Sequence, residues 1–258
     1  MPPGPYRWSL PEAAAPLAHV TRSGAGAGQG DGKTTPTKIN IIQVNLNKAH
    51  GAQIELLNKI NKLKSYIAFV TEPYCYKKCL SIPPKNSHIL PTNRKVHTRA
   101  AIFSSKDIAI NEISELCHRD MAIGITKLEG RTTVLVSLYL DINHSPVPDF
   151  LVKALEYSKS RGYSMLIGSD TNSHSTLWGK ETKNRGEQLE EIIDTYNLDI
   201  HNRGKIPTYD CSLGQSIIDV TLSMDLKIAV EDWKACKIYN HSDHHSICLL
   251  YTSPSPRD

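Results

Sequence analysis

The sequence has no apolar run that approaches the roughly 18 residues of a membrane span. It also has no secretory signal at its N-terminus, where Pro, Glu and Arg interrupt every apolar stretch. We therefore expect a protein that acts inside the cell, without a membrane partner and without secretion.

A strong excess of charge of either sign is missing as well. The formal net charge is +4 at pH 7 and the pI is near 8.6, while 40% of the residues are hydrophobic and 22% are charged. This composition is ordinary for a soluble globular chain that buries a core. It permits a nucleic-acid partner, but it falls short of the dense Lys/Arg stripe of a purely electrostatic DNA-binding protein.

Cysteine is too scattered to indicate a zinc centre. Of the six cysteines, only Cys75 and Cys79 have a spacing close to that of metal ligands. No second Cys or His pair follows at zinc-site spacing, and structural zinc normally needs four such ligands. We expect free thiols in a reducing compartment.

We expect three parts along the chain. Residues 1–37 hold six prolines and a Gly/Ala-rich run, so they bury too little apolar surface to offset the entropy of ordering and should be disordered. Residues 38–250 should form the folded domain. Residues 251–258 read YTSPSPRD, which resembles a translated sequencing adapter, and should be a non-core tail. On that interpretation the natural protein continues beyond Leu250.

Strand-like and helix-like segments alternate in the middle part. Apolar, β-branched runs predict strands at 38–46, 67–70, 100–104, 122–127, 132–140, 165–168, 217–222 and 246–249. Apolar residues at helical spacing predict helices at 54–64, 150–160 and 185–196. A doubly wound sheet would need more helices. The pattern therefore favours an α/β (α+β) fold with two packed sheets flanked by helices.

Polar residues collect where the predicted strands end, and a side chain just past a buried strand is held rigidly yet stays open to a ligand. These positions are Asn45 and Asn47, Glu72, Tyr139 and Asp141, the run 168–172, and the run 240–244. Asp219 adds a carboxylate inside an apolar run, where a buried charge needs a partner.

Each position has a simpler interpretation when taken alone, such as turn residues, a capping turn, an exposed carboxylate or a surface loop. Together they supply what phosphodiester hydrolysis requires. Carboxylate oxygens suit Mg²⁺, and an Asp beside a His forms a base with its orienting group. Asn and Tyr side chains donate to phosphate oxygens and to developing negative charge.

The same residues resemble a known family. Seven segments follow the order of the motifs of the endonuclease/exonuclease/phosphatase superfamily: QVNLN (43–47), TEPY (71–74), VSLYLD (136–141), GSDTNSHSTLWG (168–179), IPTY (206–209), IIDVTL (217–222) and SDHHSI (242–247). The stretch HS-x-LWG at 174–179 is typical of the apurinic-endonuclease-like domain of non-LTR (LINE-type) retrotransposons. The resemblance covers residues 38–250.

The resemblance implies a catalytic role for five residues. His244 matches the catalytic histidine, and Asp219 matches the carboxylate that orients it and raises its basicity. Asp170 matches the aspartate that activates water or protonates the leaving group. Asn172 matches the asparagine that holds a phosphate oxygen, and Tyr139 the tyrosine that contacts the phosphate.

The resemblance also implies a metal site for Mg²⁺, with Mn²⁺ as the alternative ion. Glu72 matches the metal-binding glutamate, Asp243 the aspartate before the catalytic histidine, and Asn45 an asparagine near both metal and phosphate. Many relatives carry Asp where this chain has Asn47, which weakens the metal site or leaves Glu72 as the main anionic ligand. We assign Asn47, and Arg185 in the pair Arg185–Gly186 that resembles the family's R-G pair, to phosphate or DNA contact.

The family's fold is a four-layer sandwich of two mixed sheets with outer helices, which agrees with the predicted strands and helices. Its activity implies that the chain nicks double-stranded target DNA and leaves a 3′-hydroxyl that primes reverse transcription. A reverse transcriptase is then expected in the same full-length polypeptide, with a nuclear location and a monomeric isolated domain.

Two other functions remain open. The first is hydrolysis of a different phosphodiester or phosphomonoester, such as a phospholipid, which the HS-x-LWG stretch and the lack of membrane-seeking segments disfavour. The second is a catalytically dead relic that only binds nucleic acid. The intact acidic residues and His244 argue against the relic, whereas Asn47 argues for it.

Overall fold

The computed structural model describes residues 38–92, 97–226, 229–236 and 241–252. The segment expected to be disordered, residues 1–37, lies outside these ranges, and so do residues 253–258. Two six-stranded sheets form the centre of the described chain.

The first sheet is built around β1 (Lys38–Asn45). β1 runs parallel to β2 (Tyr66–Thr71) and antiparallel to β16 (Ser246–Thr252). The parallel pair requires a crossover, which α1 (His50–Ile60) supplies. The sheet has the order β15 (Ala229–Cys236), β16, β1, β2, β6 (Ala100–Ser105) and β5 (Ser87–Leu90).

The second sheet repeats this plan. Its parallel pair is β9 (Arg131–Tyr139) and β10 (Ser164–Asp170), joined through α2 (Asp149–Arg161). The sheet has the order β11 (Asp199–Ile200), β14 (Asp219–Met224), β10, β9, β8 (Met121–Leu128) and β7 (Asn111–Glu112). Each sheet thus has one parallel pair at its middle and antiparallel neighbours around it, so both sheets are mixed.

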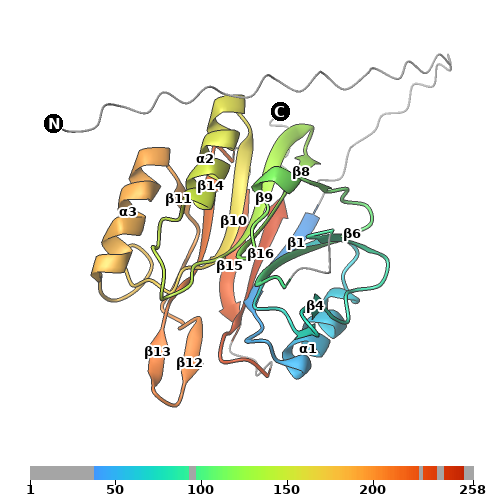
Figure 1. Cartoon of the computed structure of the whole chain (residues 1–258), viewed down its shortest axis with the longest axis horizontal. Helices are drawn as coiled ribbons and strands as arrows, with labels where there is room; N and C mark the ends of the chain where they lie inside the picture. The colour runs from blue at the N-terminus through green and yellow to red at the C-terminus, as the bar shows by residue number, and fades with distance from the viewer. Residues whose placement is uncertain (1–37, 93–96, 227–228, 237–240, 253–258) are drawn as a thin grey trace. The chain divides into compact units, whose positions relative to one another are not determined.

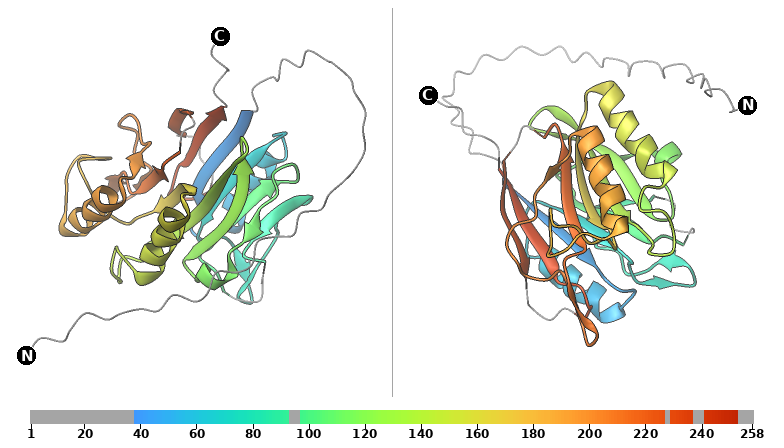
Figure 2. Two further views of the ribbon diagram at one scale, coloured as in Figure 1. Left: turned by 90° about the horizontal axis from the view of Figure 1, so that it is seen from above. Right: turned by 90° about the vertical axis from the view of Figure 1, so that its left-hand side faces the viewer.

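The helices lie on the outer faces of the two sheets. α1 packs against the first sheet, whereas α2 and α3 (Asn184–Tyr196) pack against the second (Figures 1 and 2). The inner faces of the sheets meet in a core that includes Phe69, Leu135 and Leu166. The order of layers is helix, sheet, sheet, helix, which confirms the predicted fold class.

The sequence of β1 explains why it lies at the centre. Ile39 and Ile41 pack into the core between the sheets, while Ile42 and Val44 pack under α1. A strand that is covered on both faces is apolar at successive positions rather than at every second one. This is why the run KINIIQVN predicts a buried strand.

One polar side chain of β1 crosses the inter-sheet core. Gln43 is 3% exposed, and its amide nitrogen donates to the carbonyl oxygen of Ser169 on β10 at 3.0 Å. Its amide oxygen accepts the hydroxyl of Thr221 on β14 at 2.8 Å, and Thr221 also accepts the indole N–H of Trp233 at 3.0 Å. All of these groups are buried. Shifting one sheet along the other would leave them without hydrogen-bond partners and would lower the free energy of unfolding.

The predicted helix at 54–64 has the wrong boundaries, since α1 begins at His50 and ends at Ile60. No side chain caps its start at Ala49, so the sequence carries no signal there. The remaining short elements, which sequence periodicity did not predict, are β3 (Cys75–Tyr76), β4 (Cys79–Leu80), η1 (Ser114–Leu116), β12 (Tyr209–Cys211) and β13 (Gly214–Ser216).

β15 was also not predicted, because a bulge disrupts its alternation of apolar and polar residues. Trp233 and Ala235 are buried, but the register with β16 shifts between Glu231 and Lys234, and Asp232 has a φ of +54°. At the chain end, the assignment of residues 251 and 252 to a non-core tail is wrong. Tyr251 lies on β16 and is fully buried in the inter-sheet core.

The cysteines agree with the prediction. All six are free thiols that are only partly buried, and none belongs to a group of potential metal ligands within the described ranges. In the same part of the chain, no helix combines the length and the apolarity that crossing a membrane requires.

The close contact between the sheets at Gly168 gives a first prediction. A Cβ at this position would lie 2.6 Å from Cβ and Cγ of Phe69, so Gly168→Ala must push the two sheets apart. We expect it to lower the free energy of unfolding by about 1–3 kcal/mol, the usual cost of overpacking, in a urea titration. Gly130→Asn is the control, because a Cβ there meets nothing within 4 Å and Asn tolerates its φ of +73°. Equal stability of the two variants would contradict the tight inter-sheet contact.

Candidate active site

Strand ends from both sheets meet at one edge of the sandwich. β1 ends at Asn45, whose partner on parallel β2 is Thr71, directly before Glu72. In the second sheet, β9 ends at Tyr139 and β10 ends at Asp170, and these two residues are also partners in register. Because parallel strands present their carboxyl ends at the same edge, each sheet delivers polar groups to one place.

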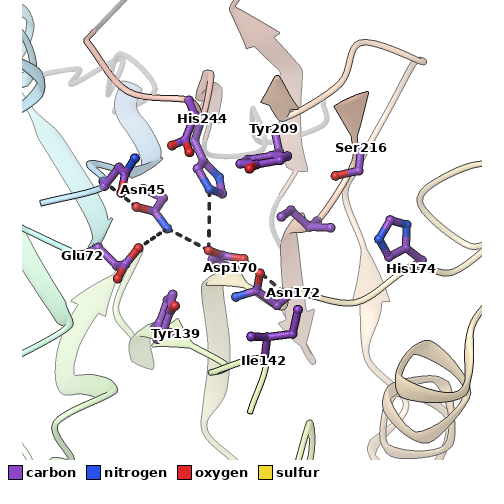
Figure 3. A pocket seen from close by; sticks show the side chains of 13 residues that line it. Asn45, Glu72, Tyr139, Ile142, Asp170, Asn172, His174, Tyr209, Ser216 and His244 are labelled. Carbon is purple, nitrogen blue, oxygen red and sulfur yellow. Dashed lines mark hydrogen bonds and ion pairs between the residues drawn. The ribbon is translucent and has the colours of Figure 1, made fainter. Parts of the chain in front are cut away.

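These residues line a pocket of about 320 Å³ (Figure 3). The lining consists of Asn45, Asn47, Glu72, Tyr139, Ile142, Asp170, Asn172, His174, Tyr209, Ser216, Ile218, Asp243 and His244. The structure thus brings eight of the ten predicted site residues to one pocket. The other two are Asp219, which contacts His244 from behind the lining, and Arg185, which lies outside it.

His244 is held between two buried aspartates. Its Nδ1 lies 2.8 Å from Asp219 Oδ2, and its Nε2 lies 3.9 Å from Asp170 Oδ2. Burial by itself lowers the pKa of His244, but the carboxylates of Asp219, Asp170 and Asp243 outweigh it and raise the pKa to about 9. The ring is therefore a cation at neutral pH, and its Nε2 side faces the pocket and Asp170 (Figure 3).

Thr208 holds the backbone near Asp219 and His244 in place. The hydroxyl oxygen of Thr208 accepts the N–H groups of Ile218 at 3.1 Å and Asp219 at 3.0 Å. The carbonyl oxygen of Thr208 accepts the N–H of His245 at 2.7 Å. Thr208 is fully buried, so it connects the start of β14 to the loop that carries His244 without competition from water.

Asn45 joins the acidic groups of the two sheets. Its amide nitrogen donates to Asp170 Oδ2 at 2.8 Å and lies 3.4 Å from Glu72 Oε2. Its amide oxygen accepts the N–H of Asn47 at 2.7 Å. Burial and the nearby Asp219 carboxylate raise the pKa of Asp170 well above the ordinary range of an aspartate. A carboxyl with such a raised pKa is able to exchange a proton near neutral pH.

The backbone is strained where several of these side chains are presented. Glu72, Asn47 and Asn172 have φ values of +44°, +45° and +45°. Asparagine adopts this left-handed region with little difficulty, but a glutamate does so rarely. Glu72 is held there because its N–H donates to Arg99 O at 2.8 Å and its carbonyl accepts the N–H of Lys48 at 2.8 Å. Strain of this kind concentrates at functional sites.

Tyr139 and Asn172 lie on the second-sheet side of the pocket. Burial, followed by the charges of Glu72 and Asp170, raises the pKa of Tyr139 to about 12, so its phenol remains a hydrogen-bond donor. The N–H of Asn172 donates to Asp170 Oδ1 at 3.1 Å, and its side-chain nitrogen donates to Leu140 O at 3.2 Å. The two side chains are therefore fixed beside Asp170.

Arg185 was predicted to contact DNA, but its side chain is surrounded by main-chain oxygens. Its guanidinium donates to the carbonyl oxygens of His144 at 2.5 Å, Leu140 at 3.1 Å and Asp141 at 3.0 Å, and its Nε to that of Thr171 at 3.4 Å. All three nitrogens are thus directed at main-chain oxygens of the loops that follow β9 and β10. The arrangement holds these loops together, and the predicted DNA contact of Arg185 finds no support in it.

The sequence analysis gave no role to five lining residues, Ile142, His174, Tyr209, Ser216 and Ile218, nor to Lys48, which lies outside the lining. Tyr209 lies in the IPTY segment but was given no role, and its ring centroid is 5.0 Å from that of His244. Lys48 follows the QVNLN segment, and its Nζ lies 2.6 Å from Glu72 Oε1. Tyr209 could have been found from its motif. Lys48 could not, because it is an exposed lysine whose partner is distant in the sequence.

The donor set fits a divalent cation with oxygen ligands. Side-chain atoms of Asp170, Asp219 and His244 lie within 4.8 Å of one another, and Glu72 and Asp243 add carboxylates to the pocket. Among the described residues, Asp219 Oδ1 is buried without a hydrogen-bond partner. Hard oxygen donors of this kind suit Mg²⁺ or Mn²⁺ better than softer ions. The assignment of the metal to Glu72, Asp243 and Asn45 stays a prediction.

Two sequence comparisons find similarity to known proteins. A family model described as endonuclease-reverse transcriptase matches residues 133–248. A curated relative, a putative 115 kDa protein in the type-1 retrotransposable element R1DM of Drosophila melanogaster, is 24% identical over 227 residues. That alignment covers 82% of this chain but only 22% of the relative's length.

Solved structures show the same fold. The endonuclease domain of TRAS1, a telomere-specific non-LTR retrotransposon, superposes with a TM-score of 0.67 at 23% identity, covering 85% of this chain and 100% of that one. The AP endonuclease of Leishmania major gives a TM-score of 0.62 at 10% identity, covering 84% and 88%. The resemblance to retrotransposon endonucleases and the AP-endonuclease-like fold are thereby confirmed. Both support a hydrolytic nuclease or phosphodiesterase.

The central place of Thr208 gives a second prediction. Thr208→Val keeps the shape of the side chain but leaves the N–H groups of Ile218 and Asp219 without their acceptor. We expect a loss of about 1–3 kcal/mol in the free energy of unfolding, the penalty of an unpaired buried group, measured by urea denaturation. Thr195→Val on α3 is the matched control, because Thr195 is exposed and the same change there should cost no more than about 0.5 kcal/mol. A loss at Thr208 no larger than in the control would contradict the role assigned to its hydroxyl.

Proposed function

We propose that this chain is a divalent-metal-dependent DNA endonuclease that nicks one strand of a duplex and leaves a 3′-hydroxyl. The observation that carries the proposal is the chain of contacts from Asp219 through His244 to Asp170 and Asn45, which ends at Glu72. It places a cationic donor, a carboxyl with a raised pKa and an anionic ligand around one pocket. Phosphodiester hydrolysis needs these three groups.

Each residue has a part in the reaction. Asp170 accepts a proton from the attacking water, because its raised pKa matches it to proton transfer near neutral pH. The water oxygen forms the new bond to phosphorus while the bond from phosphorus to O3′ breaks, and O3′ takes up a proton from solvent water and leaves as the hydroxyl. His244, kept cationic by Asp219, donates from Nε2 to the charged phosphate oxygens. Tyr139 and Asn172 stand beside Asp170 to orient the same phosphate.

Glu72 is the residue that we propose to hold the metal ion, with Asp243 and Asn45 nearby. The ion, when bound, polarises the phosphate and neutralises charge that develops on its oxygens. Lys48 already pairs with Glu72 and adds positive charge beside it. Asn47 lines the pocket as a neutral group, so Glu72 carries most of the negative charge at this end.

The wider context follows from the curated relative, of which the chain spans about a fifth. We infer that the domain works within a longer retrotransposon polypeptide that also contains a reverse transcriptase. The 3′-hydroxyl left at the nick then serves as the primer for DNA synthesis. This use requires entry into the nucleus, where the double-stranded target lies. The isolated domain is expected to act as a monomer.

The third prediction tests the reaction itself. Supercoiled plasmid incubated with the chain and Mg²⁺ should become relaxed circles, and EDTA should prevent this. DNA ligase should reseal the circles, since ligation requires a 3′-hydroxyl and a 5′-phosphate at the nick. His244→Ala should lower the nicking rate by about 10²–10⁴-fold, the range for loss of a proton-transfer or charge-stabilising group.

His88→Ala on β5 is the control for the loss of a histidine, because His88 lies far along the first sheet from the pocket lining. Absence of nicking by a folded wild-type chain that binds metal would reject DNA cleavage, and phospholipid and nucleotide substrates would then be assayed. DNA binding without nicking, unchanged in His244→Ala, would instead indicate a protein that only binds nucleic acid.

A fourth prediction concerns the neutral residue at position 47. Asn47→Asp adds a carboxylate to the pocket, and metal affinity rises with the number of charged oxygen ligands. We expect the Mg²⁺ concentration that gives half-maximal nicking to fall several-fold. Asn58→Asp, on the exposed face of α1, adds the same charge away from the pocket and serves as the control. An equal or higher Mg²⁺ requirement in Asn47→Asp would show that position 47 does not face the metal.

A further inference from the structure

Arg99, which directly precedes β6, is a buried cation outside the pocket lining. Its side chain is 11% exposed, although arginine is rarely buried to this degree without partners. Burial by itself lowers the pKa of Arg99, but hydrogen bonds from its guanidinium to Asp120 and Asp141 outweigh it and raise the pKa further. The guanidinium is therefore a permanent charge in the wall of the candidate site.

The guanidinium joins two carboxylates from different strands. Its Nε and Nη2 lie 2.5 Å and 2.7 Å from the two oxygens of Asp120, which precedes β8. Its Nη1 lies 2.6 Å from Asp141 Oδ2, just after β9. Only a planar fork satisfies this arrangement, since a lysine ammonium cannot reach all three oxygens in one plane. The Arg99 side chain thus fixes the start of β8 relative to the end of β9.

The contacts of Arg99 with Asp120 and Asp141 lie next to Tyr139. Its ring centroid lies 4.6 Å from the Arg99 guanidinium carbon, and its N–H donates to Asp120 O at 2.8 Å. Asp141, held by Arg99, is only two residues further along the chain. The phenol ring therefore has the guanidinium on its face and an anchored backbone on both sides, and it has little freedom to turn.

Arg99 also reaches the other side of the pocket through its main chain. Its carbonyl oxygen accepts the N–H of Glu72 at 2.8 Å, which helps to hold Glu72 at its positive φ. Glu72 follows β2 in the first sheet, whereas Tyr139 ends β9 in the second. A single residue thus contacts the main chain of the proposed metal-binding residue Glu72 and the ring of the proposed phosphate-binding Tyr139.

We propose that Arg99 is a positioning residue for the nicking reaction, which holds the phenol of Tyr139 in the orientation that the phosphate requires and supports the backbone of Glu72 through its own main chain. The catalytic part of this inference rests on the proposed function. The positioning of Tyr139 does not, because it concerns contacts within the folded chain alone. A purely structural ion pair would stabilise the fold without any specific effect through Tyr139.

The test compares Arg99→Lys with Arg131→Lys. The first variant keeps the charge but loses the fork and the flat contact with the ring. Arg131 is exposed at the start of β9, the strand that ends at Tyr139. We expect Arg99→Lys to lower kcat for plasmid nicking by about 10²-fold, since small displacements of a positioning group have effects of that size. The KM for DNA should change little. Arg131→Lys should leave both unchanged.

The decisive measurement repeats the substitution in a Tyr139→Phe background. If Arg99 acts through the Tyr139 hydroxyl, Arg99→Lys should lower kcat much less once that hydroxyl is gone. Loss of the same factor in both backgrounds would overturn the proposal. Asp141→Asn provides a second variant if Arg99→Lys fails to fold, because it leaves the contact between Arg99 and Asp120 in place. Asp141→Asn should also lower kcat, and it should do so much less in the Tyr139→Phe background.

A measurement on the protein alone, without DNA, tests the positioning of Tyr139 independently of the proposed function. In protein labelled with 3-fluorotyrosine, the ¹⁹F resonance of residue 139 is identified by its absence in Tyr139→Phe. Arg99→Lys should shift or broaden that resonance, and Arg131→Lys should not. If the wild-type chain does not nick DNA but the resonance moves, the proposed function fails while the positioning of Tyr139 stands. An unmoved resonance in folded Arg99→Lys overturns the inference.

Discussion

The candidate site depends on how the two sheets are aligned across their shared core, and buried polar contacts fix this alignment. The amide of Gln43 bonds to Ser169 and Thr221, and the hydroxyl of Ser137 on β9 donates to Val70 O on β2, within a largely apolar interface. Asn45 lies two residues further along β1, and Asp170 lies one residue beyond Ser169. Sliding one sheet by a single residue would break these buried hydrogen bonds and separate Asn45 from Asp170, which are now 2.8 Å apart.

That alignment gathers more negative charge than the chain itself neutralises. Glu72, Asp170 and Asp243 line one pocket with Asp219 behind it, and the nearby cations are His244 and Lys48. Burial and mutual repulsion raise the pKa of Asp170, while attraction to the carboxylates raises that of His244. A concentration of charge of this kind destabilises a fold. Its presence in a well-packed domain therefore agrees with a bound cation.

The errors of the sequence analysis have local physical causes. The start of α1 has no side-chain cap, and β15 loses its alternation at a bulge, so neither leaves a periodic signal. Tyr251 was assigned to a tail because of the prolines and serines after it, yet it completes a strand that pairs with β1 and is fully buried. The assignment of Arg185 to DNA, which rested on a resemblance to the family's R-G pair, stays a prediction, and its donors are engaged by main-chain oxygens of neighbouring loops.

The sequence by itself determined the class of fold and the identity of most of the pocket. Apolar runs that end in Asn45, Glu72, Tyr139 and Asp170 mark buried strands with functional ends, and a strand's period and its last residue are local properties. Only the tertiary structure decided which groups touch. The pairing of His244 with Asp219 was expected from the family resemblance alone, whereas those of Lys48 with Glu72 and of Arg99 with Asp120, Asp141 and Tyr139 were not expected. All of them join residues from different strands and loops. Such contacts depend on strand order and sheet packing, which no local pattern encodes.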